Sequence, residues 1–140
     1  MKYIVLLGRI LYSAMFLKAA PGHFTGGMLG YASAAGVPAP SFLVPFAGVL
    51  ALLGGISILL GFKAKWGAWL IVLFLIPVTF MMHAFWKGTD PMQIQMQMVN
   101  FMKNLSMLGA ALLIAYFGSG PLSLDARTKT SSNYSSAVKS

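Results

Sequence analysis

The sequence has 140 residues, of which 58% are hydrophobic and only 9% are charged, whereas soluble domains carry about 25% charged residues. This excludes an ordinary water-soluble globule, and the long apolar runs do not alternate as the strands of a membrane β-barrel do. The net charge of +8 comes from scattered Lys and Arg residues without a basic stripe, so we expect no nucleic-acid partner, and the absence of cysteine excludes thiolate chemistry.

The first predicted membrane-spanning helix covers residues 3–20 and contains Arg9 and Lys18. A cleaved signal peptide is the competing interpretation, but Arg9 splits its apolar region and no small-residue cleavage site follows. The Arg9 side chain either reaches the cytoplasmic headgroups or braces the bundle. Residues 21–41 contain many Gly, Ala and Pro, and predict at most a short interfacial helix near residues 27–35.

Three further spans are predicted over residues 42–62, 66–86 and 99–117. The second span has no charged residue and contains glycines that permit close helix packing. The third is bracketed by tryptophans, which favour the two membrane interfaces. Together these runs predict an all-α membrane protein, with a bundle of four transmembrane helices over residues 1–118 and a flexible tail over residues 119–140.

The basic residues predict the orientation of this bundle. Four spans place the chain ends and the turn with Lys63 and Lys65 on one side of the membrane. Further basic residues fall on that side, namely Lys2, Arg127, Lys129 and Lys139. Because cytoplasmic loops carry an excess of Lys and Arg, both termini are predicted to be cytoplasmic.

Polar residues inside the spans form the candidate site. A charge at the centre of a spanning helix costs roughly 2.5 to 3.5 kcal/mol, so such residues are candidates for function. Lys18, His83 and Lys103 are predicted at similar depth in the outer half. Helical spacing places Asn104 on the same face as Lys103, and Phe80, His83 and Lys87 on one face of the third span.

This cluster suits a quinone carbonyl or a lipid phosphate, because His, Lys and Asn side chains donate hydrogen bonds and aromatic rings offer stacking surface. The predicted ligand-binding residues are Lys18, Phe80, His83, Trp86, Lys103 and Asn104. With Asp90 as the nearest carboxylate, the cluster has neither an acid–base pair of carboxylates nor a zinc ligand set. The alternative is structural: Lys103 pairs with Asp90 or a phosphate, and His83 bonds a backbone carbonyl.

Met92, Met96 and Met98 offer thioethers that could hold Cu(I) beside a histidine. Methionine is also common filler in apolar helices, and no metal site is predicted.

Several segments give the chain a family resemblance. These are "LLGRILYSAMFLKAAPGHF", "GVPAP", "LLGGISILLGFKAKWGAWLI", "HAFW" and "NFMKNLSMLGAALLIAYFGSGPLSLDA". Together they resemble DoxX-like proteins, over nearly the whole chain as far as Ala126. The matching polar positions are Arg9, Lys18, His83, Lys103 and Asn104. Many members have a glutamate shortly before the paired glycines of the second span, where this chain has Ala51-Leu52-Leu53, and this weakens a proton-coupled mechanism.

The resemblance implies a multi-pass protein of the bacterial inner membrane linked to quinone-dependent oxidoreductases. We therefore expect a membrane subunit that binds a quinone or lipid-like molecule in the outer half and supports a redox partner, without a redox cofactor of its own. The alternative is a non-catalytic accessory or scaffold subunit of a larger membrane complex. Expected partners are membrane lipids and either other membrane or redox subunits or further copies of the chain.

Overall fold

The computed structural model describes residues 1–139. Ser140, which ends the predicted tail, lies outside the described residues, as does the side chain of Lys139. The elements are α1 (Lys2–Ala19), η1 (Ala20–Phe24), α2 (Gly26–Ala34), α3 (Pro40–Leu60), α4 (Ala64–Met82), η2 (Phe85–Lys87), α5 (Pro91–Phe117) and α6 (Leu124–Lys139). Four segments are long and apolar enough to cross a membrane: α1 with η1, α3, α4 with η2, and α5. The predicted all-helical chain with four spans is confirmed, and the orientation of the termini stays a prediction.

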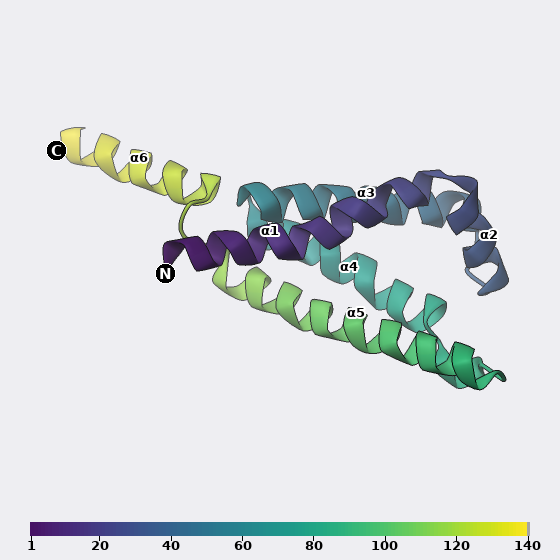
Figure 1. Ribbon diagram of the computed structural model, residues 1–140. Helices are drawn as coiled ribbons and strands as arrows, with labels where there is room; N and C mark the ends of the chain where they lie inside the picture. Colours follow the sequence, from purple (N-terminus) through teal and green to yellow (C-terminus); the bar gives the residue numbers. More distant parts are fainter. Residues whose placement is uncertain (140) are drawn as a thin grey trace.

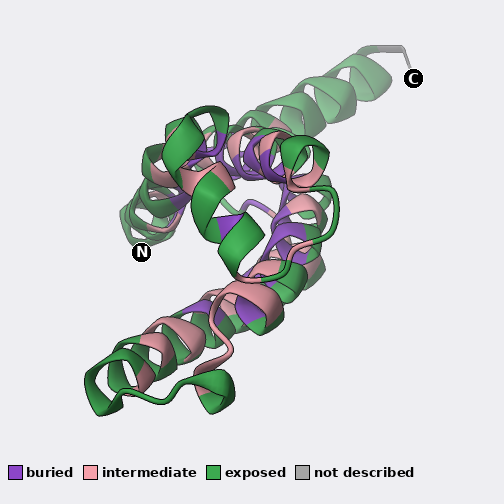
Figure 2. Ribbon diagram, turned by 90° about the vertical axis from the view of Figure 1, so that its right-hand side faces the viewer, coloured by how far each residue is buried: buried purple, intermediate pink, exposed green. Residues whose placement is uncertain are grey.

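The long helices pack in the order α1, α3, α4, α5, with α3 between α1 and α4 and with α5 against α4 (Figure 1). We call the end at which α1 begins and α5 ends the proximal end, and the opposite end, which carries η1, α2 and η2, the distal end. Helix α6 projects away from the proximal end (Figure 1). Seen from the distal end, the buried residues face the middle of the bundle and the exposed residues face outward (Figure 2).

At the proximal end, α3 and α4 approach closely through small residues. A Cβ atom added at Gly54 would lie 2.8 Å from Ile71 Cδ1 and 2.9 Å from the Gly67 carbonyl oxygen. A Cβ atom added at Gly67 would collide with the side chain of Ser57. Gly54, one of the glycines predicted to allow close packing, therefore does so where α3 meets α4.

Toward the distal end, α4 and α5 slope away from α1 and α3, and α2 lies at the open end of the resulting wedge (Figure 1). The core packs in the narrow part of this wedge and includes Phe16, Ala51, Ile58, Ile71 and Leu75. The short helix α2, Gly26–Ala34, confirms the short helix predicted near residues 27–35, and its interfacial position stays a prediction.

Helix α4 ends at Met82, before the predicted boundary at residue 86. The Tyr31 hydroxyl donates to the Met82 carbonyl oxygen at 3.0 Å, which satisfies one of the carbonyls freed at the helix end. His83 follows with non-helical φ and ψ of −120° and 40°. The prediction that His83 shares a helix face with Lys87 is therefore wrong, because the regular helix stops between Phe80 and His83.

Helix α5 begins at Pro91, eight residues before the predicted start at residue 99. Asp90 caps it by accepting a hydrogen bond from the Gln93 backbone N–H at 3.2 Å, and proline at the first helical position needs no such partner. The methionine- and glutamine-rich connection is thus the first part of the helix. With 27 residues α5 is about 40 Å long, longer than the hydrocarbon core of about 30 Å.

The segment predicted as a flexible tail contains helix α6. Ser123 caps it, since its Oγ accepts a hydrogen bond from the Ala126 backbone N–H at 3.1 Å. The tail is therefore helical rather than irregular over Leu124–Lys139, and its flexibility stays a prediction.

Candidate functional site

The proximal end contains a polar cluster around Arg9, which is only 4% exposed. Its Nη2 donates to the carbonyl oxygens of Pro121 and Leu122. The guanidinium also lies against Gly61, where any side chain would collide with Nη1. Of the two roles predicted for Arg9, the structure supports bracing of the bundle rather than contact with headgroups.

Asp125 completes this cluster by capping α4 from outside the helix. Its carboxylate accepts hydrogen bonds from the backbone N–H groups of Lys63 at 2.7 Å and Ala64 at 3.2 Å, and from the Ser119 hydroxyl at 3.1 Å. Burial raises the pKa of Asp125, but these hydrogen bonds and the charge of Lys129 outweigh it, so the pKa lies below its usual value. We call Arg9, Ser119, Ser123 and Asp125 the proximal clamp. It ties the start of α6 to α1 and α4, and its role is structural.

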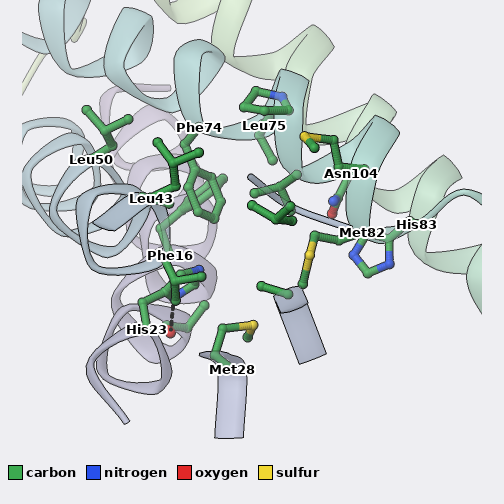
Figure 3. Close-up of a pocket in the computed structure, with 18 of the residues that line it drawn as sticks. Phe16, His23, Met28, Leu43, Leu50, Phe74, Leu75, Met82, His83 and Asn104 are labelled. Carbon is green, nitrogen blue, oxygen red and sulfur yellow. Dashed lines mark hydrogen bonds between the residues drawn. The ribbon is translucent and has the colours of Figure 1, made fainter. Parts of the chain in front are cut away.

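The distal wedge holds a cavity of about 370 Å³, within the range of small-molecule sites. Residues of α1, η1, α2, α3, α4 and α5 line it, so every span contributes to its wall. Most of the lining is apolar, including Phe16, Leu50, Phe74 and Leu75, whose side chains point into one shared space (Figure 3). The side chains that bring nitrogen or oxygen to this wall are His23, Tyr31, His83, Lys103 and Asn104.

Asn104 is the most informative of these polar groups. It is only 5% exposed, and its side chain points into the cavity (Figure 3). Within the described residues 1–139 its amide makes no hydrogen bond, although nearly all buried polar side chains do. The amide atoms of Asn104 are not among the fully enclosed polar atoms that lack a partner. The cavity therefore presents an amide whose donors and acceptor are free and can be reached from the cavity.

A hydrogen-bonded relay closes one side of the cavity and joins α2 to α4 and α5. Tyr31 donates to the Met82 carbonyl oxygen at 3.0 Å and accepts from Gln97 Nε2 at 2.6 Å. Gln97 Oε1 in turn lies 2.8 Å from His83 Nδ1. His83 thus bonds a side chain of α5 rather than the backbone carbonyl of the structural alternative.

His23 lies across the cavity from His83 and Asn104 (Figure 3). It is 7% exposed, its Nδ1 lies 3.0 Å from the Ala19 carbonyl oxygen, and its ring meets Phe74 edge-on with 5.5 Å between centroids. Both histidines of the chain are therefore fixed on the cavity wall by one ring nitrogen each.

Of the six predicted ligand-binding residues, the structure brings His83, Lys103 and Asn104 to the cavity. Lys103 is exposed and donates to Asn100 Oδ1 at 3.2 Å, not to Asp90. Lys18 is exposed and does not line the cavity.

Phe80 and Trp86 also lie off the cavity wall. They pack on Phe101 together with Phe85, in an aromatic cluster that joins η2 to α5. The rings that do line the cavity include Phe16 of α1, Phe46 of α3 and Phe74 of α4.

Sequence reasoning missed Tyr31 and Gln97 and gave His23 no role in the site. Tyr31 was the available signal, because a hydroxyl-bearing ring stood out in the small-residue segment predicted to form an interfacial helix. Among the described residues no group of three His, Cys, Asp or Glu could hold a metal ion. Met92 and Met96 are exposed on α5 and do not line the cavity.

These features define a small, multi-pass helical membrane protein with one apolar distal cavity among its spans. The DoxX family model matches residues 4–84, and the chain belongs to the DoxX family. It is 36% identical to "Inner membrane protein YqjF" of Escherichia coli (strain K12) over 124 residues, which cover 86% of this chain and 88% of that protein. It is 31% identical to "Inner membrane protein YphA" of the same organism over 126 residues, or 89% of each chain. No solved structure gives a significant match.

The chain is thus an integral inner membrane protein of the DoxX family. The matched family segment ends at residue 84, so Lys103 and Asn104 lie beyond it. The two relatives, by contrast, match most of the chain.

Proposed function

We propose that the distal cavity binds a lipid-soluble molecule of the quinone type and that the protein thereby supports a redox partner in the membrane. The observation that carries this proposal is Asn104, whose side chain is only 5% exposed, points into an apolar cavity and has no hydrogen-bond partner among the described residues. A ligand with an apolar body and a polar oxygen would fill the apolar space and bond this free amide.

The position of the cavity suits a ligand that dissolves in the bilayer. Met15, Phe46 and Leu73 line the cavity, and their side chains are exposed by 39%, 45% and 55%. We infer that these partly exposed apolar side chains open the cavity to the bilayer between the diverging helices.

Electron transfer itself is assigned to a partner protein. The two acidic residues of the chain, Asp90 and Asp125, cap α5 and α4, so neither serves as an acid or base at the cavity. The chain contributes binding and positioning of the ligand.

Co-purification tests this proposal. The protein is purified from its native membrane, and quinones are extracted and quantified per mole of protein, for the wild type and Asn104→Leu. Lys18→Ala, a cation off the cavity wall, is the matched control. We expect bound quinone to fall at least about fivefold in Asn104→Leu and to be unchanged in the control. Wild-type amounts of quinone in Asn104→Leu would overturn the proposal.

A second candidate is an accessory subunit of a larger membrane complex. Helix α5 favours it, because α5 is the least buried of the four spans and exposes Lys103 and Ser106. A partner helix on this face would shield these polar groups from lipid. This role predicts a complex that survives gentle detergent in Asn104→Leu and dissociates in Ser106→Leu.

A further inference from the structure

The hydrogen-bond relay determines which nitrogen of His83 carries a proton. The Met82 carbonyl oxygen only accepts, so the Tyr31 hydroxyl hydrogen is used there. Tyr31 must then accept from the Gln97 amide nitrogen. This leaves Gln97 Oε1, an acceptor, facing His83 Nδ1 at 2.8 Å. Nδ1 therefore carries a hydrogen.

His23 is fixed in the same way by a simpler contact. Its Nδ1 lies 3.0 Å from the Ala19 carbonyl oxygen, which can only accept a hydrogen bond. Nδ1 of His23 therefore also carries a hydrogen. In the neutral form of each ring the remaining nitrogen, Nε2, therefore has a lone pair and acts as an acceptor.

Both of these acceptor nitrogens belong to side chains that line the cavity, and neither makes a hydrogen bond with any of residues 1–139. The Asn104 amide can donate or accept. Lys103 has donors only, but it is exposed and its ammonium bonds Asn100. The polar groups of the cavity wall are thus mainly hydrogen-bond acceptors. A quinone carbonyl is also only an acceptor, so it cannot form a hydrogen bond with these acceptors.

We infer that the cavity selects a hydroxyl-bearing lipophile, such as a lipid-soluble hydroquinone or phenol, over the corresponding quinone. This inference rests on the proposed function. The sequence led us to expect that histidine donates a hydrogen bond to the ligand, whereas here histidine accepts one from it. A ligand hydroxyl can donate a hydrogen bond to Nε2 of His23 or His83. A ligand carbonyl would instead place its oxygen lone pairs against the lone pairs of these nitrogens, which is repulsive. A site built to bond a hydroxyl rejects an analogue without it.

A matched series of ligands tests this selection in wild-type protein reconstituted in nanodiscs. The series is a short-chain alkylhydroquinone kept reduced under argon, its quinone, its dimethyl ether, and dodecanol. Each displaces a radiolabelled alkylhydroquinone at equilibrium. We expect the hydroquinone to bind about tenfold more tightly than the quinone or the dimethyl ether, which is the effect of one well-made hydrogen bond.

Cavity variants then locate the acceptor. His23→Phe and His83→Phe should lower hydroquinone affinity about tenfold or to the level of the quinone, and leave quinone affinity unchanged. His23→Gln, whose amide keeps an acceptor, should retain the preference, and Lys18→Ala should bind all ligands as the wild type does. The wild-type series stands on its own if a Phe variant fails to fold.

The outcomes separate this inference from the proposed function. A quinone that binds as tightly as the hydroquinone, or more tightly, would overturn the inference and leave the proposed function intact. If no ligand binds, or if Asn104→Leu binds all of them as the wild type does, the proposed function fails. If dodecanol binds with the same affinity as the hydroquinone, the result would support recognition of a hydroxyl group. It would also assign the ligand to the fatty alcohols.

Discussion

The two ends of the bundle bury polar side chains in opposite ways. At the proximal end, Asp125 accepts three hydrogen bonds and Arg9 donates to two carbonyls. At the distal end, Asn104 is as little exposed as Arg9 and has no partner among the described residues. Polar groups of the first kind stabilise the fold, whereas the amide of Asn104 is free to bond the ligand that we propose.

An unpartnered polar atom suggests a binding site only where an adjacent cavity has room for a ligand. Arg9 Nε and Nη1, Ser13 Oγ and Thr79 Oγ1 also lack partners among the described residues. None of these side chains lines the distal cavity. They are enclosed by packed protein, so no ligand can reach them.

The largest expected effect comes from the tight packing of α3 on α4. Gly67→Leu should destabilise the protein by about 3 kcal/mol or prevent folding, because a side chain there collides with Ser57. Thermal unfolding in detergent measures this. Gly109→Ala is the control, since a Cβ there has open space, and its stability should stay within about 1 kcal/mol of the wild type. Wild-type stability of Gly67→Leu would show that the two helices are not in close contact.

The proximal clamp should be the next most sensitive. Asp125→Ala removes a carboxylate from the N-terminus of α4 and should cost about 1 to 2 kcal/mol, as the loss of a helix cap does. It should also release α6, which accelerates tryptic cleavage after Arg127. Asp90→Ala removes the other helix cap and should leave that cleavage rate unchanged. Equal cleavage of the wild type and Asp125→Ala would argue against the clamp.

Acid should weaken the same clamp. The pKa of Asp125 lies below its ordinary value, so the carboxylate contributes its full stabilisation above the ordinary aspartate pKa of about 3.9. This contribution is lost as the pH falls through the lowered pKa that Asp125 has in the folded protein. The measured quantity is the rate of amide hydrogen exchange in α6, divided by the rate in a peptide of the same sequence. Lowering the pH should raise this ratio in the wild type and leave it unchanged in Asp125→Asn. The same acid response in both would assign it to other groups.

The smallest effect has the opposite sign. Asn104→Leu should stabilise the ligand-free protein by about 1 kcal/mol, because an amide without a protein partner is replaced by an apolar side chain on an apolar cavity wall. Asn100→Leu, which removes an amide that is already bonded to Lys103, should not stabilise it. Chemical unfolding of delipidated protein compares the two. A destabilised Asn104→Leu would mean that the amide is satisfied in the native state.

The spans followed from hydropathy, because only continuous apolar helices satisfy the backbone in lipid. The site was only partly predictable. Helical spacing placed Asn104 beside Lys103 correctly within one continuous helix. It failed for His83 and Lys87, because α4 ends at Met82. The carbonyl oxygen of Met82 accepts a hydrogen bond from Tyr31, a residue 51 positions away in the sequence. Such a tertiary contact leaves no periodic signal in the sequence.

For the proposed ligand, the exposed part of the cavity lining, Met15, Phe46 and Leu73, determines which concentration governs occupancy. A ligand that arrives sideways from the bilayer equilibrates with its mole fraction in lipid and not with its molarity in water. Diluting the vesicles with buffer then leaves occupancy nearly constant, whereas adding ligand-free lipid lowers it. Affinities for this protein therefore have meaning only at a stated ratio of ligand to phospholipid.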